Sequence, residues 1–91
     1  MNEPAIDLGI VMAIISSYKN HPIAEGMIVF GEVGLSGEVR AVSMPEQRVA
    51  EAKKLGFEVC VMPEVSVDMV KKVRGIKVIG VKNIIDVTRL I

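Results

Sequence analysis

Aromatic residues are scarce in this 91-residue sequence. They make up 3% of it, and the three rings are Tyr18, Phe30 and Phe57. Domains that bind single-stranded nucleic acid by base stacking rely on exposed rings, so this mode of binding is not indicated. Cysteine occurs once, at Cys60, within an apolar run. One cysteine excludes a disulfide framework and a cysteine-rich metal site within this chain, and we expect the thiol to be a small core residue.

The sequence also lacks an excess of charge and a long apolar run. Eleven basic and eleven acidic residues cancel, and the pI is about 6.6. Nucleic-acid-binding domains usually carry a basic excess, so contact with nucleic acid here requires a local patch. The longest apolar run, residues 8–15, is shorter than the roughly 20 residues that a membrane helix needs. With no signal peptide evident, we expect a cytoplasmic protein without a membrane partner.

Aliphatic side chains dominate the composition. Hydrophobic residues make up 51% of the chain and the mean hydropathy is +0.45. The core must therefore consist of valine, isoleucine, leucine, methionine and alanine. Such a composition, with regularly placed glycines, is typical of an α/β fold with a largely buried sheet. The length indicates a single domain over residues 1–91.

The first half predicts a helix followed by a hairpin. Asn2 can cap a helix whose apolar pattern over residues 5–15 runs nearly all round, which is typical of a helix buried on most sides. That helix should end before His21. Residues 27–33 predict a strand, and the glycines after them predict a hairpin whose return strand covers residues 38–42.

A second helix is predicted after the hairpin. Ser43 and Glu46 have the spacing of a capping box at the start of a helix over residues 44–55. Gly56 occupies the position of a left-handed C-cap.

The remaining residues predict alternating strands and helices. Strands over residues 57–62 and 76–81 enclose a short helix over residues 66–73, and Asn83 with Asp86 begins a last amphipathic helix. Strands joined through helices run parallel, with a right-handed crossover. The sequence therefore predicts a sheet built from a hairpin and βαβ units, packed by helices.

Neither a nucleotide-binding loop nor a metal site is evident. The glycine pairs in residues 31–34 and 34–37 are not followed by the Lys-Ser/Thr of a phosphate-binding loop, so we interpret them as turn glycines. His21 has no cysteine or second histidine near it in the sequence, which argues against metal binding. We expect no cofactor in this chain.

Two segments make the chain similar to the Lon protease domain family. Members of that family carry a serine in a Gly-Pro-Ser-Ala-Gly motif that opens a buried helix, and a lysine base at the start of a later helix. A Ser–Lys pair works because a desolvated lysine accepts the serine proton. Here the first motif reads Glu3-Pro4-Ala5-Ile6-Asp7, so the nucleophile position is Ala5. The lysine position, about nine residues past the glycine matched by Gly37, holds Glu46.

No other residue restores the catalytic pair. Arg48 cannot act as the base because its guanidinium stays protonated. The other serines occupy predicted helix ends, turns or caps, and none has a predicted basic partner: Ser16, Ser17, Ser36, Ser43 and Ser66. We therefore expect no peptidase activity from this chain.

Within the Lon-like superfamily, the chain most resembles the C-terminal Lon-protease-like domain of the RadA (Sms) family of bacterial DNA-repair proteins. The hairpin run over residues 29–40 resembles that family's hairpin almost residue for residue. Residues 3–5, 13–17 and 52–57 extend the resemblance to essentially the whole chain. It implies a Lon protease-like fold (ribosomal protein S5 domain 2-like), truncated so that the N-terminal strands of the domain lie upstream of Glu3.

The same resemblance implies a function for the chain. RadA-type proteins form hexameric rings, and a four-cysteine zinc finger and a RecA-like ATPase precede this domain. ATP, Mg and Zn would then bind in those N-terminal parts, and the whole protein would be an ATP-dependent DNA helicase or branch-migration ATPase. The implied partners are DNA, other subunits of the ring and a RecA-type recombinase. The chain itself is expected to be a non-catalytic scaffold that contacts DNA.

Basic residues on the return strand and the second helix are the candidate DNA contacts: Arg40, Arg48, Lys53 and Lys54. A separate basic group follows the next helix: Lys71, Lys72 and Arg74. If Val49, Ala52 and Leu55 form the inward stripe of the second helix, its lysines are exposed. Several cations on one surface bind phosphates through counterion release. A solvated helix face paired with Glu46 and Glu51 explains the same pattern, and Glu32 is expected to pair with Arg40 across the hairpin.

Three functions stay open on the sequence alone. The leading one is the non-catalytic RadA-type scaffold with a DNA-contact surface. The second is an active Lon-type Ser–Lys peptidase domain with a displaced catalytic pair. The third is the Lon-like domain of a magnesium-chelatase-type ATPase, against which the wording of residues 30–40 argues.

Overall fold

The computed structural model describes residues 4–91, so the predicted cap at Asn2 lies outside the described residues. The elements are a 3₁₀ turn η1 (Pro4–Ile6), α1 (Asp7–Lys19), β1 (Met27–Val29), β2 (Glu32–Val33), β3 (Val39–Arg40), α2 (Pro45–Lys54), β4 (Val59–Pro63), a 3₁₀ segment η2 (Glu64–Val70), β5 (Lys77–Val81) and α3 (Ile84–Thr88). The predicted α/β class is confirmed.

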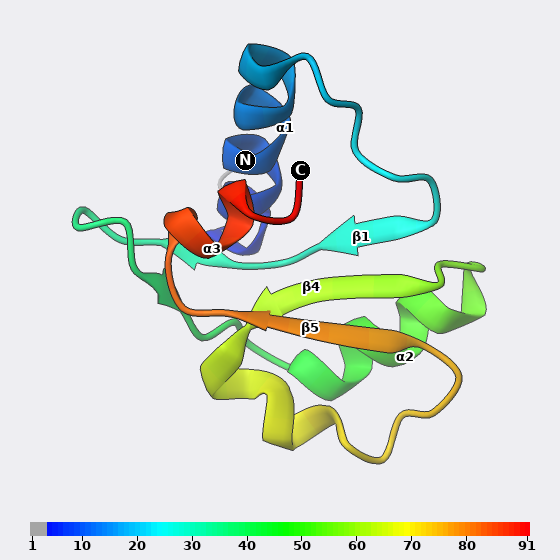
Figure 1. The fold of residues 1–91 in the computed structure, drawn as a ribbon. Helices are drawn as coiled ribbons and strands as arrows, with labels where there is room; N and C mark the ends of the chain where they lie inside the picture. Colours follow the sequence, from blue (N-terminus) through cyan, green and yellow to red (C-terminus); the bar gives the residue numbers. More distant parts are fainter. Residues whose placement is uncertain (1–3) are drawn as a thin grey trace.

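The centre of the molecule is a parallel three-stranded sheet in the order β1-β4-β5. β2 and β3 form a separate antiparallel hairpin. Helices α1 and α3 cover one face of the sheet, and α2 with η2 covers the other (Figure 1). The parallel connection from β4 through η2 to β5 is the predicted one.

Each face of the sheet has its own core. Alternate residues of β4 divide between the two: Val61 packs with α1 and α3, whereas Cys60 and Met62 pack under α2 and η2. The buried members of the first core are Leu8, Met12, Val39, Val61, Val81 and Val87. Those of the second are Val49, Cys60, Met62 and Val70. Side chains on a strand point to opposite faces in turn, so one short strand supports both layers, and Cys60 is the core residue that the sequence predicted.

Helix α1 differs most from its predicted environment. Leu8 and Met12 are fully buried one turn apart, but the opposite side of the helix is open to solvent. The prediction of burial on most sides is wrong. The physical reason is that the main neighbours of α1 within residues 4–91, which are η1, α3, β1 and β2, lie on one side of the helix, the side that carries the buried Leu8 and Met12. The exposed apolar side chains follow at four-residue spacing: Ile6 (52%), Ile10 (52%), Ile14 (63%) and Tyr18 (91%).

The strand predicted over residues 27–33 is broken at Gly31. The Gly31 amide donates to the Ala5 carbonyl (2.8 Å), and the Leu8 amide donates to the Gly31 carbonyl (2.9 Å). A Cβ at position 31 would lie 2.9 Å from the Leu8 side chain. The backbone therefore leaves β4 to hold the start of α1, and resumes as β2 against β3. The return strand is also short, since it covers Val39–Arg40 instead of residues 38–42, and on its other side the Val39 amide donates to the Lys82 carbonyl (2.8 Å).

The second helix begins differently from the capping-box prediction. Its N-cap is Met44, with a φ of 52°, and no side chain caps it. Ser43 instead accepts hydrogen bonds from Arg48. Leu55, predicted to face inward, is 67% exposed because it lies beyond the last helical turn. Gly56 adopts a φ of +95° and is the predicted left-handed residue after the helix.

The last elements mix confirmed and wrong predictions. The strand predicted over residues 57–62 is β4, which begins at Val59 and includes Pro63, and the short helix predicted over residues 66–73 is the 3₁₀ segment η2, which begins earlier, at Glu64, and ends at Val70. Ser66 is buried without a hydrogen-bond partner for its hydroxyl, so it is not a cap. The cap at Asn83 is confirmed, since its side chain accepts from the Asp86 amide (3.1 Å).

Candidate anion-binding pocket

The described residues form a basic pocket of about 380 Å³ between the end of α2 and the loop that leads into β5. Its lining residues come from two segments that are 18 residues or more apart in the sequence: Ala50, Lys53 and Lys54 on α2, and Lys72, Val73 and Arg74 after η2. No acidic residue is among them. Four cations and two aliphatic side chains therefore line one open pocket.

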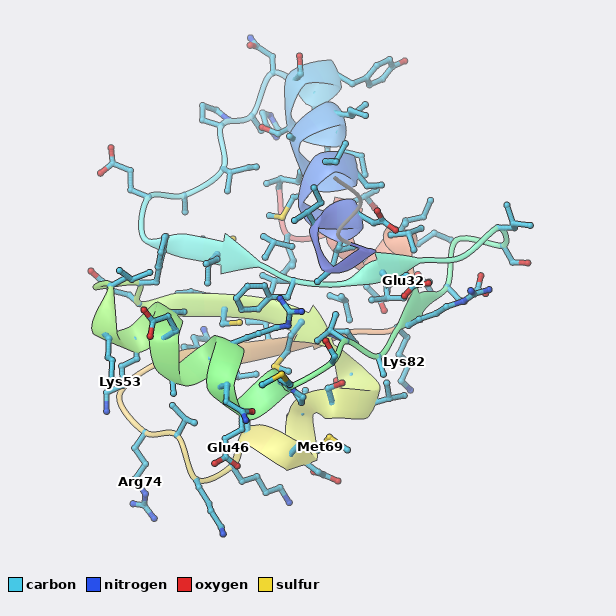
Figure 2. The ribbon with its side chains drawn as sticks, turned by 180° about the vertical axis from the view of Figure 1, so that it is seen from behind. Glu32, Glu46, Lys53, Met69, Arg74 and Lys82 are labelled. Atoms are coloured by element: carbon cyan, nitrogen blue, oxygen red, sulfur yellow. The ribbon has the colours of Figure 1, made fainter. Side chains whose placement is uncertain are left out.

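The end of α2 determines how Lys53 enters the pocket. The helix ends with three backbone hydrogen bonds, in which the amides of residues 55, 56 and 57 donate to carbonyls of the last turns. The Lys53 side chain then crosses over Gly75, where a Cβ would lie 2.9 Å from Lys53 Cε and 3.2 Å from its Nζ. Gly75 also has a φ of +88°, which disfavours any other residue. Figure 2 shows Lys53 and Arg74 at the same corner of the molecule.

The opposite wall follows the 3₁₀ segment. The Val73 amide donates to the Val70 carbonyl (3.0 Å), and Val70 and Val73 both belong to the core under α2. This anchors the loop while its flanking cations, Lys72 and Arg74, are exposed. Lys71, the remaining cation of this stretch, instead makes an ion pair with Asp68 (3.2 Å) and does not line the pocket.

Within residues 4–91, none of the four lining cations makes an ion pair with an acidic side chain. The ion pairs there involve Arg40, Lys71 and Arg89 instead. Unpaired like charges around one concave surface raise the local positive potential. The chain is neutral overall, so the pocket is a local concentration of positive charge on an otherwise balanced molecule.

Arg40 and Arg48, predicted as DNA contacts, lie outside the pocket and have other partners. Arg40 makes ion pairs with Glu38 (3.0 Å) and Glu32 (3.8 Å), so the predicted pairing across the hairpin is confirmed. Arg48 donates to the Ser43 carbonyl (2.7 Å) and lies over the Phe30 ring, 5.9 Å from its centroid. The structure thus places only Lys53 and Lys54 of the predicted set together.

The hairpin is an ionic cluster of its own. The Ser36 amide and the Arg40 guanidinium donate to the Glu38 carboxylate. Hydrogen bonding, first from its own backbone amide and then from Arg40, lowers the pKa of Glu38 from its ordinary value. Figure 2 shows Glu32, at the hairpin, on the opposite side of the molecule from Lys53. The hairpin and the pocket are therefore separate surfaces.

The positions matched to a protease catalytic pair hold neither a hydroxyl nor an amine. Ala5 is 4% exposed, and its carbonyl accepts from the Gly31 amide. Glu46 is exposed in the first turn of α2. Among residues 4–91, the serine hydroxyls with recorded hydrogen bonds are those of Ser16, to a carbonyl, and Ser43, to Arg48; neither bonds a lysine.

The sequence did not predict that the two basic groups line the same pocket. Lys72 and Arg74 were placed apart from Lys53 and Lys54, because nothing in the linear pattern shows that the loop before β5 folds against α2. The signal available was Gly75, a glycine directly after the basic group. Only the structure shows why a glycine is needed there: the Lys53 side chain occupies the space that a side chain at position 75 would fill.

Fold and pocket together define an α/β domain with a basic pocket and no Ser–Lys pair at the matched positions. The chain belongs to the family whose model is described as "Subunit ChlI of Mg-chelatase", which matches residues 2–66. No helix within residues 4–91 is long and apolar enough to span a bilayer.

Relatives that match nearly the whole chain carry the name DNA repair protein RadA. That of Bacillus subtilis (strain 168) is 49% identical over 89 residues, which cover 98% of this chain and 19% of the relative. That of Streptococcus pneumoniae (strain ATCC BAA-255 / R6) is 44% identical over 89 residues, covering 98% and 21%. The relative from Halalkalibacterium halodurans is 45% identical over 86 residues, covering 94% and 19%. The chain thus spans about a fifth of the length of the relatives it matches.

Proposed function

We propose that the chain is a non-catalytic, Lon-protease-like domain of a RadA-type DNA-repair ATPase, where it serves as a ring-assembly scaffold and a DNA-contact surface. In this proposal ATP, Mg and Zn act in parts of the protein outside this chain. Its partners are DNA, neighbouring subunits of a hexameric ring and a RecA-type recombinase in the cytoplasm. The observation that carries the proposal is the basic pocket in a chain that is 43–49% identical to proteins named RadA.

The DNA-contact role is supported by the charge arrangement of the pocket. A solvated helix face would show its lysines paired with neighbouring glutamates, but Lys53 and Lys54 face two more cations from another segment. Phosphates bound by several cations release counterions, which gives salt-sensitive and sequence-independent binding. The described aromatic side chains do not line the pocket, so base stacking is not part of the proposal.

The experiment compares two sets of charge reversals for DNA affinity at several salt concentrations. Reversal of the pocket cations (Lys53, Lys54, Lys72 and Arg74) should weaken binding and reduce the salt slope by roughly 0.7–0.9 per lost phosphate contact. Arg40 and Arg48 bind to other residues of the chain, so their reversal should reduce the stability of the fold and leave the salt slope of DNA binding unchanged. A slope unchanged by the first set would refute the DNA-contact role, and a slope reduced by the second would transfer it to the hairpin and α2.

The scaffold role is supported by the exposed apolar side of α1. Four large side chains, from Ile6 to Tyr18, form one ridge along the helix, and subunit interfaces bury apolar and aromatic anchors of this kind. Ile10→Asp with Ile14→Asp should reduce self-association of the full-length protein in sedimentation. Leu35→Asp is the matched control, since Leu35 is fully exposed on the hairpin turn. Equal sedimentation of all three proteins would remove this support.

The peptidase alternative is tested with unstructured casein, which the chain should leave intact because position 5 has no hydroxyl. The chelatase alternative is favoured by one observation, the family model that matches residues 2–66. The coding sequence on either side of this domain distinguishes the RadA-type function from the chelatase-type function. A RecA-type ATPase before this domain supports the proposal, whereas a chelatase-type ATPase after it overturns the proposal.

A further inference from the structure

We infer that the basic pocket is a site for a phosphate monoester with its attached nucleoside, such as the 5′-terminal phosphate of a DNA strand or a free nucleotide. This inference rests on the DNA-contact function proposed above and specifies what the pocket recognises. It differs from general backbone binding, in which cations are spread along a surface.

The convergence of the cations is the first argument. Lys53 and Lys54 approach from the last turn of α2, and Lys72 and Arg74 approach from the loop before β5. They surround one hollow instead of following a line across the domain. A strand end can enter a hollow with its phosphate first, whereas a continuous backbone must pass over a surface.

Charge balance is the second argument. A phosphodiester carries one negative charge, but a phosphate monoester carries about 1.5 to 2 at neutral pH and has three acceptor oxygens. Four cations without recorded acidic partners among the described residues match the more highly charged group. The planar Arg74 guanidinium can bind two of the phosphate oxygens at once.

Size and lining are the third argument. The volume of about 380 Å³ lies within the range of small-molecule sites, roughly 300–1,000 Å³. A phosphate alone would leave much of this space empty. Ala50, Val73 and the aliphatic stems of the lysines provide an apolar wall, against which a sugar and base can pack.

The negative end of the α2 dipole works against anion binding at this position. Its effect is limited here, because the carbonyls of Glu51, Ala52 and Lys53 already accept backbone hydrogen bonds from residues 55, 57 and 56. The partial charge of about half an electron at a helix end is also small beside four full positive charges. The net potential of the pocket therefore stays positive.

The test measures binding of the 91-residue chain to a short single-stranded oligonucleotide with either a 5′-phosphate or a 5′-hydroxyl. Charge-assisted hydrogen bonds contribute roughly 1.5–3 kcal/mol, so the phosphorylated strand should bind about ten-fold tighter or better. This preference should decline below about pH 6, where the monoester dianion takes up a proton and becomes a monoanion. Competition with adenosine monophosphate distinguishes the two sources, since only a free-nucleotide site is displaced by it at a concentration similar to that of the oligonucleotide.

Matched variants assign the preference to the pocket. Lys53→Gln and Lys72→Gln should each remove the preference for the 5′-phosphorylated strand, so that the two oligonucleotides bind with similar affinity. Lys82→Gln should keep it, because Lys82 is also exposed but lies away from Lys53 (Figure 2). Circular dichroism confirms that each variant is folded. Equal binding of both strands by the unaltered chain overturns the monoester site while leaving DNA contact intact, and loss of all DNA binding would overturn the proposed function itself.

Discussion

Gly56 and Gly75 share a backbone conformation but have different neighbours. Their φ angles are +95° and +88°, so alanine at either position should cost roughly 1–2 kcal/mol of stability. A Cβ at position 56 meets nothing within 4 Å, whereas one at position 75 meets the Lys53 side chain. Gly75→Ala should therefore displace Lys53 and weaken binding of the 5′-phosphorylated oligonucleotide, and Gly56→Ala should not.

Both variants need the same two measurements, the free energy of unfolding in urea and the dissociation constant for the oligonucleotide. Similar losses of stability with unequal losses of affinity are the expected result. Equal affinities would mean that Lys53 takes no part in binding.

Cys60 gives the chain a pH dependence at the alkaline end. Its side chain is fully buried, and burial raises the pKa of the thiol from 9.0 to about 11. Above pH 9 the unfolded chain loses this proton while the folded chain retains it up to about pH 11, so stability falls across this interval. Urea unfolding should show a steeper decline from pH 9 to 11 for the native chain than for Cys60→Ala, which has no thiol. Parallel curves would contradict the burial of an uncharged thiol.

At the scale of elements, two helix starts look alike in sequence and differ in structure. Asn83 caps α3 through a hydrogen bond from the Asp86 amide, but Ser43 stands one residue before the N-cap of α2 and caps nothing. Asn83→Ala should therefore cost about 1 kcal/mol of unfolding free energy. Ser43→Ala should cost only a few tenths, since the exposed Ser43 hydroxyl bonds only to Arg48. The free energy of unfolding of both variants can be measured by thermal and urea denaturation. A larger loss of stability in Ser43→Ala than in Asn83→Ala would contradict this interpretation.

The same comparison shows which elements could be predicted from sequence. The strands of the sheet and α2 follow from local patterns, and so does Gly56, because one residue type suits a left-handed C-cap. The cap of α2 could not be predicted, since Met44 has a φ of 52°, a left-handed conformation that methionine rarely adopts. The environment of α1 could not be predicted either, because an apolar pattern all round does not show which sides meet another element.

For the whole molecule, neutrality conceals a separation of charge. The hairpin joins Arg40 to Glu32 and Glu38, while the pocket gathers cations without recorded acidic partners in the described part of the chain. Because the basic and acidic residues of the chain cancel, composition shows only that an anion site needs a local cluster of cations. Which cations form it depended on packing between α2 and the loop before β5, and the one glycine that marks this contact in the sequence, Gly75, does not specify which segment packs against it.

The arrangement of layers also decides whether a protease could be recovered from this fold. Ala5 is in η1, directly before α1, and Glu46 is in the first turn of α2. Helices α1 and α2 cover opposite faces of the sheet (Figure 1). In Ala5→Ser with Glu46→Lys, the new lysine would be exposed like the glutamate it replaces. A solvated lysine keeps a pKa near 10.4 and stays protonated at neutral pH, so it cannot accept the serine proton. We therefore expect the folded double variant to leave casein intact, as measured by gel electrophoresis after prolonged incubation. Cleavage by this variant, absent from Ala5→Ser alone, would show that position 46 is shielded and that the chain retains the geometry of a peptidase.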